Sequence, residues 1–170
     1  MSLTNRETWT LIHGLILGSL FLLAFAGGLA GFWSLRPELV TPQGVKDRLL
    51  RLKVGTTTMA VLAWATVITG TWVVYPWYRS KSPDSPKSLL LSNPDTKDWH
   101  EFGMEWKEHI AWFAPILATV AAFLTIYYGP RLVRNKTARS ITLGFFVAAF
   151  ATAAIAGVFG ALITKAAPVR

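Results

Sequence analysis

Apolar residues are gathered into four long uncharged runs, which are separated by charged segments. The runs cover residues 11–33, 55–77, 110–128 and 141–164. At 1.5 Å of rise per residue, a helix of about 20 residues crosses a hydrocarbon core of about 30 Å. The runs are rich in alanine, leucine and glycine and lack the alternation of apolar and polar residues that marks strands. The pattern therefore predicts four transmembrane helices.

The spacing of the runs predicts one domain over residues 1–170, with helices at about residues 9–33, 55–78, 107–128 and 140–164. Short connections place consecutive helices side by side, so we expect an all-α, integral membrane four-helix up-down bundle. The segment 79–107 is the longest connection, and it carries a short apolar patch at residues 89–91. The first run is too long for the core of a signal peptide and is expected to remain as a helix.

Composition supports a membrane protein and excludes several chemistries. The chain is 52% hydrophobic and 15% charged, whereas soluble domains are about 25% charged. It has no cysteine, which excludes thiolate ligands, iron–sulfur clusters and covalently attached c-type haem. The net charge of +8 is typical of the basic cytoplasmic loops of membrane proteins, so we expect a lipid bilayer and no nucleic acid as partner.

The distribution of basic residues predicts the orientation. Residues 34–54 and 129–140 hold nine lysine and arginine residues and only two acids. The other side of the bundle has eight basic residues and seven acids, spread over both termini and residues 79–108. Because dense basic charge in short loops marks the cytoplasmic side, we expect both termini outside the cytoplasm of a bacterial inner membrane.

Two histidines lie where the first and third runs enter the membrane. His13 follows Trp9 by four residues, and His109 follows Trp106 by three. If both tryptophans mark one interface, both imidazoles lie about 5–6 Å below it. The first and third helices of an up-down bundle run in the same direction and are diagonal, about 11–14 Å apart. We therefore expect His13 and His109 to be the two axial ligands of one haem b near the periplasmic side.

Three basic residues flank this end of the bundle, and we expect them to neutralise the haem propionates: Arg6, Arg79 and Lys107.

Each histidine also has a simpler explanation. His13 could donate a hydrogen bond between helices, and His109 could be a polar residue of the membrane interface. His100 is nine residues from His109, so the two lie on opposite faces of a regular helix, and we expect His100 in a loop or against a redox partner. Met104 stands where a zincin motif needs histidine, and we expect no catalytic residues.

The placement of His13 and His109 resembles that of small four-helix membrane cytochromes b. The resemblance implies an electron-transfer subunit of an oxidoreductase complex, with no enzymatic activity by itself and with a periplasmic electron carrier as partner. Many such cytochromes hold two haems with four histidines. This chain has three histidines, which allow one bis-histidine haem.

Two other functions stay open. The first is a structural or assembly subunit of a larger respiratory or photosynthetic membrane complex. Small residues recur every four positions on the fourth helix, at Ala149, Ala153, Gly157 and Ala161, and they favour close contact with other membrane subunits. The segment 79–107 offers a second contact. The other function is a pigment-binding subunit, in which each histidine would hold a chlorophyll-type pigment singly.

Overall fold

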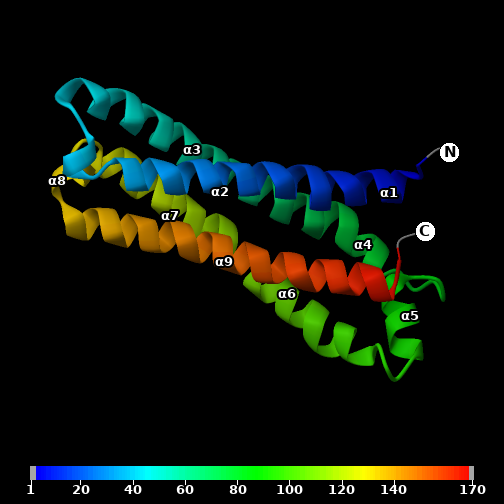
Figure 1. Ribbon diagram of the computed structural model, residues 1–170. Helices are drawn as coiled ribbons and strands as arrows, with labels where there is room; N and C mark the ends of the chain where they lie inside the picture. The colour runs from blue at the N-terminus through cyan, green and yellow to red at the C-terminus, as the bar shows by residue number, and fades with distance from the viewer. Residues whose placement is uncertain (1–2, 169–170) are drawn as a thin grey trace.

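The computed structural model describes residues 3–168, and within that range four helices are long and apolar enough to cross a membrane. These four spans are Asn5–Ser34, Pro42–Tyr78, Trp99–Tyr128 and Lys136–Ala166. They run up and down, so that both ends of the chain lie at the same end of the bundle (Figure 1). The all-α four-helix bundle is confirmed, and the chain is an integral membrane protein.

Three of the four spans are built from several helical segments. The first comprises α1 (Asn5–Thr10), the π-helical η1 (Leu11–Ile16) and α2 (Leu17–Ser34). The second comprises α3 (Pro42–Thr69), the π-helical η3 (Gly70–Val74) and α4 (Tyr75–Tyr78). The third comprises the π-helical η4 (Trp99–Met104), α6 (Glu105–Ile110) and α7 (Phe113–Tyr128). The fourth is α9 (Lys136–Ala166), and the connections contain η2 (Pro37–Leu39), α5 (Pro86–Ser92) and α8 (Arg131–Arg134).

Two helices begin earlier than their apolar runs. The second span starts at Pro42 and not near residue 55, because Thr41 caps it through Gly44 N and Pro42 occupies the first helical turn. The basic residues at 46–53 therefore belong to a continuous helix that extends beyond the apolar run. The third span starts at Trp99 and not near residue 107, so the preceding connection is shorter than predicted and contains α5.

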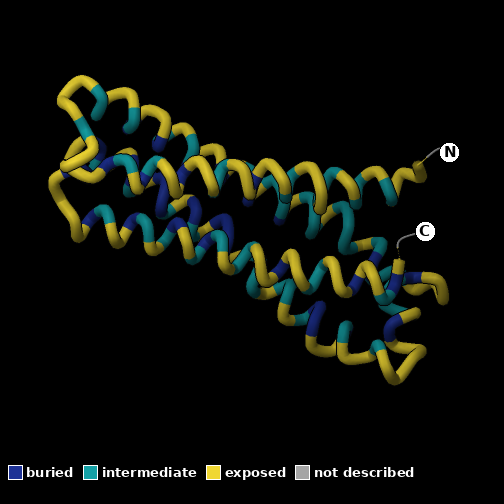
Figure 2. The backbone as a smooth tube through the Cα atoms, viewed as in Figure 1, coloured by how far each residue is buried: buried dark blue, intermediate teal, exposed yellow. Residues whose placement is uncertain are grey.

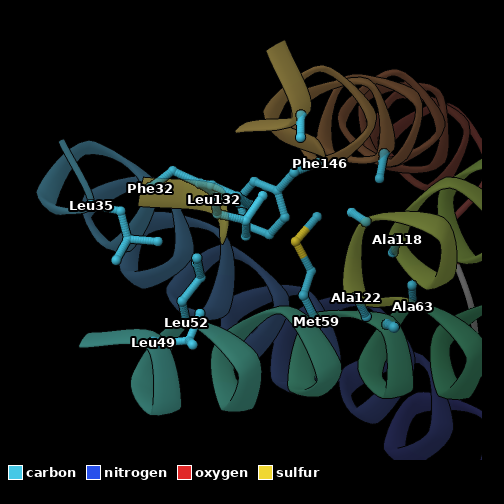
Figure 3. Close-up of a cluster of buried hydrophobic side chains, with 14 of the residues drawn as sticks. Phe32, Leu35, Leu49, Leu52, Met59, Ala63, Ala118, Ala122, Leu132 and Phe146 are labelled. Carbon is cyan, nitrogen blue, oxygen red and sulfur yellow. The ribbon is translucent and has the colours of Figure 1, made fainter. Parts of the chain in front are cut away.

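The spans pack in chain order, with α2 on α3, α3 on α7 and α7 on α9. The core lies toward the end opposite the termini, where Phe146 and Met59 are fully buried and point toward each other (Figure 3). Small residues allow close approach here. An added Cβ on Gly28 would overlap the ring of Phe146, and Ala118 and Ala149 are almost fully buried. This close packing of small residues is typical of helices in lipid, where apolar contact alone does not drive association.

Exposed positions recur along all four spans (Figure 2), and many of them are large apolar residues. Leu23, Trp72, Phe123 and Val158 are each about 60% or more exposed, one from each span. Such a surface suits the acyl chains of a bilayer.

The first and fourth spans diverge toward the end that holds the termini (Figure 1). Farther from that end, Phe25 of α2 stacks on Phe150 of α9 with ring centroids 3.9 Å apart. Nearer to it, an added Cβ on Gly18 of α2 or Gly157 of α9 would meet no atom within 4 Å. We call the region between Gly18 of α2 and Gly157 of α9 the open side of the bundle. Of the predicted small-residue stripe, Ala149 packs in the core, whereas Gly157 is exposed.

Candidate functional site

Polar side chains gather at the end of the bundle that holds the termini, together with the π-helical segments. Among residues 3–168 the π-helical segments are η1, η3 and η4, one in each of the first three spans. His13 lies in η1 and His100 in η4. Because π-helical turns are frequent at functional sites, this end is the candidate site.

His13 faces the second span. Its Nδ1 lies 3.1 Å from Thr69 Oγ1, and the Thr69 hydroxyl donates its own hydrogen to the carbonyl of Ala65 at 2.8 Å. With the Thr69 hydroxyl donated to Ala65, its oxygen accepts from His13 Nδ1–H, and in this tautomer Nε2 presents a lone pair. Gly70 makes room for the ring, since an added Cβ there would lie 2.8 Å from His13 Cε1.

His109 has the same tautomer in a different setting. Its Nδ1 lies 2.6 Å from the carbonyl oxygen of Glu105, which can only accept, so Nδ1 again carries the proton. The residue is exposed. It lies one turn before Trp112, whose ring packs edge-on against Trp64 and Trp72 on the outside of the second span. His109 therefore belongs to the outer side of the bundle.

The structure thus places the two predicted haem ligands in different surroundings. His13 is packed between the first and second spans, and His109 is exposed on the third. Two shallow hollows of the described chain lie elsewhere, one between α7 and α9 beside Gly144 and one beside Pro130. Each imidazole could serve by itself as one axial ligand, because its Nε2 is free and its Nδ1–H is held by a hydrogen bond. A haem clamped between the pair stays a prediction.

Arg79 is the centre of an ionic cluster that joins the second and third spans. Its Nη2 lies 2.5 Å from Glu105 Oε1 and 3.2 Å from Glu108 Oε1. The Tyr75 hydroxyl donates to Glu108 Oε2 at 2.8 Å. Partial burial opposes the charge on Arg79, but Glu108 and then Glu105 outweigh it, and the pKa of Arg79 lies above its usual value. Arg79 therefore already has two carboxylate partners and is not a free partner for propionates.

The other two basic residues predicted around the haem point to different places. Arg6 is exposed on α1. Lys107 lies along α9, where its Cε would be 3.1 Å from a Cβ added to Gly160. Lys107 also lies close enough to His13 for its charge to act on that ring, so of the three basic residues it is the one placed near a predicted haem ligand.

His100 is buried, with 7% of its surface exposed, although the sequence suggested a loop residue or a partner contact. Its Nδ1 lies 2.8 Å from the Tyr78 hydroxyl. Tyr78 belongs to a small second core, which we call the end cluster: Tyr78, Leu90, Met104, Ile163 and Ala167. The apolar residues at 89–91 were the sequence signal for this cluster, because Leu90 is its fully buried contribution from α5.

Comparison with protein-family models, with curated proteins and with solved structures finds no match for this chain.

We predict that Arg79→Gln destabilises the protein, because it leaves Glu105 and Glu108 facing each other without their shared cation. Hydrogen bonds to charged groups contribute about 1.5–3 kcal/mol, and the partial exposure of this cluster reduces the expected loss to about 1–2 kcal/mol. Thermal unfolding in detergent measures it. The matched control is Lys97→Gln, which removes the exposed ion pair of Lys97 with Glu101 at 3.0 Å and should cost less than about 0.5 kcal/mol. Equal losses in the two variants would contradict a stabilising role for the Arg79 cluster.

Proposed function

We propose that this chain is a small subunit of a larger membrane complex and that it binds a transmembrane helix of another subunit at its open side. The proposal is carried by the divergence of the first and fourth spans (Figure 1), beside which a Cβ added to Gly18 or Gly157 would meet no atom within 4 Å. The α5 region, with Leu89 and Leu91 about 40% exposed, offers a second contact outside the membrane.

The residues that line the open side suit a helix. Gly18 continues the stripe of α2 that is packed farther along through Phe21, Phe25 and Gly28. Gly157 follows Phe150 by two turns on α9, so it continues the side of α9 that meets the first span. In lipid, helices associate where small residues let their backbones approach closely. A partner helix entering here would extend the close packing already present at Gly28.

A second candidate function is electron transfer through a haem b with His13 and His109 as ligands. The tautomers favour it, because both histidines donate through Nδ1 and keep Nε2 free, as metal-bound histidines do. The haem would supply reversible one-electron chemistry, exchanged with a periplasmic carrier or with a cofactor of a neighbouring subunit. The chain's own contribution is to hold each ring in one tautomer through Thr69 and the Glu105 carbonyl. A pigment bound by one histidine would require the same tautomer, but it would not require His13 and His109 to face each other.

We also propose the orientation, with both termini and the α5 segment in the periplasm of a bacterial cell. The dense basic charge of residues 34–54 and 129–140 supports it. Both termini and α5 lie at one end of the bundle, opposite those segments (Figure 1).

The subunit proposal predicts that Gly157→Leu abolishes association with the native complex while the isolated chain stays folded. A Cβ at position 157 meets no atom of this chain within 4 Å, so the leucine side chain would extend from there into the space of a partner helix. Co-purification from native membranes measures association, and thermal unfolding checks the fold. The control is Gly144→Leu, which also meets no atom within 4 Å but lies beside Leu117 on the side of α9 toward the third span. If Gly157→Leu co-purifies its partners like the parent protein, the open side faces lipid.

The haem hypothesis predicts a low-spin b-type absorption spectrum in the purified protein. His13→Ala and His109→Ala should each remove one ligand and give haem loss or a high-spin species, whereas His100→Gln should leave the spectrum intact. A pigment held by single histidines would instead lose only part of its absorption in each variant. A colourless protein from haem-replete cells would reject both cofactor hypotheses and leave the subunit proposal standing.

The orientation predicts that a cysteine at Ser82 reacts with an impermeant maleimide added to intact cells. The chain has no native cysteine, and Ser82 is exposed, whereas its neighbour Ser85 is 1% exposed and unsuitable. Gln43→Cys, exposed at the start of α3 at the other end of the bundle, should react only after permeabilisation. The reverse pattern of labelling would invert the topology.

A further inference from the structure

We propose that His100 is a pH sensor that holds the connection between the second and third spans against the end of the fourth span and releases it under acidic conditions. We call the segment that moves the cap, residues 80–104, which contains α5 and η4.

The cap is held to the bundle by the end cluster. Leu90 of α5 is fully buried, and Met104 of η4 is 6% exposed. They pack with Ile163 and Ala167 at the last turn of α9 and with Tyr78 at the end of α4. This cluster is separate from the main core, so it can open, with η4 at the start of the third span, while the main core stays packed.

His100 is the ionisable residue of the cap that is buried beside this cluster. Its Nδ1 is hydrogen bonded to the Tyr78 hydroxyl, and its ring lies 5.8 Å from the Tyr78 ring, centroid to centroid. Neutral imidazole satisfies this arrangement with either nitrogen protonated. Imidazolium has two N–H donors and a charge, and a charge in an apolar environment is costly without a counter-ion.

The charged groups around His100 do not provide a free counter-ion. The charged groups near His100 are Lys87 of α5, Arg79 at the end of α4, and Glu105 and Glu108 of α6. Both carboxylates are already bound to Arg79. The fourth span contributes Ile163 to the cluster and Ala167 at its C-cap, with Ala166 packed beside them. The docked cap therefore prefers neutral His100.

The direction of the pH effect follows from this preference. In the open cap His100 is solvated and takes up a proton near pH 6.5, as histidine does in water. Docking is then fully favourable above about pH 6.5 and weakens as the pH falls below it, because the open state binds the extra proton. One proton linked to opening changes the equilibrium about tenfold per pH unit.

The test measures how often Leu90 becomes accessible. Leu90→Cys and, separately, Ser82→Cys are placed in the otherwise cysteine-free full chain, and maleimide labelling rates are followed from pH 7.5 to 5.5 in detergent. Leu90 is fully buried and Ser82 is exposed, so the ratio of the two rates reports opening and cancels the pH dependence of the thiol reaction. The ratio should be constant above about pH 6.5 and rise about tenfold per pH unit below it.

Three second-site variants identify the sensor. His100→Gln should make the ratio independent of pH, whereas Lys97→Gln, at the exposed ion pair with Glu101, should keep the rise. Tyr78→Phe should raise the ratio at every pH and keep the slope, because it removes the hydrogen bond but leaves His100 able to take up a proton. A flat ratio in the parent chain, or an unchanged rise in His100→Gln, would overturn the proposal.

Discussion

The structure depends on the requirement that every polar group of the backbone be hydrogen bonded inside the chain where water is absent. The four spans meet it as continuous helices, and threonines within them follow the same rule. Thr56, Thr66, Thr125 and Thr142 each donate their hydroxyl to the carbonyl four residues earlier. Because these polar groups are hydrogen bonded within their own helix, packing between spans depends on the fit of their surfaces. The closest contacts form where glycine and alanine face a neighbouring span.

The same requirement explains why the fold could be predicted from the sequence. An uncharged run of about 20 residues has few alternatives to a transmembrane helix. The ends of the helices are less constrained, because a helix can continue into water. The second span does so from Pro42, through basic residues that gave no apolar signal, because Thr41 and Pro42 favour a helix start there.

The candidate site was harder to predict, because it depends on which way side chains point around each helix. The spacing of His13 and His109 from their tryptophans predicts their depth in the membrane, but it does not predict which way each side chain points around its helix. The π-helical turns η1 and η4 each add a residue to their spans and rotate the next part of the helix by about 100° relative to a regular helix. His100 and His109 would lie on opposite faces only if residues 98–109 formed a regular helix, and η4 breaks that regularity. Tryptophan spacing and residue periodicity carried no sign of these turns.

The polar end and the open side result from the same geometry. At this end, the first span contacts the second through the hydrogen bond between His13 and Thr69. The start of the third span contacts the fourth where Lys107 lies against Gly160. Arg79 of the second span ties these two pairs together through Glu105 and Glu108. The first and fourth spans have no comparable contact at this end of the described chain, so they separate there. The ionic cluster holds the second and third spans together at this end, and the first and fourth spans separate on the opposite side.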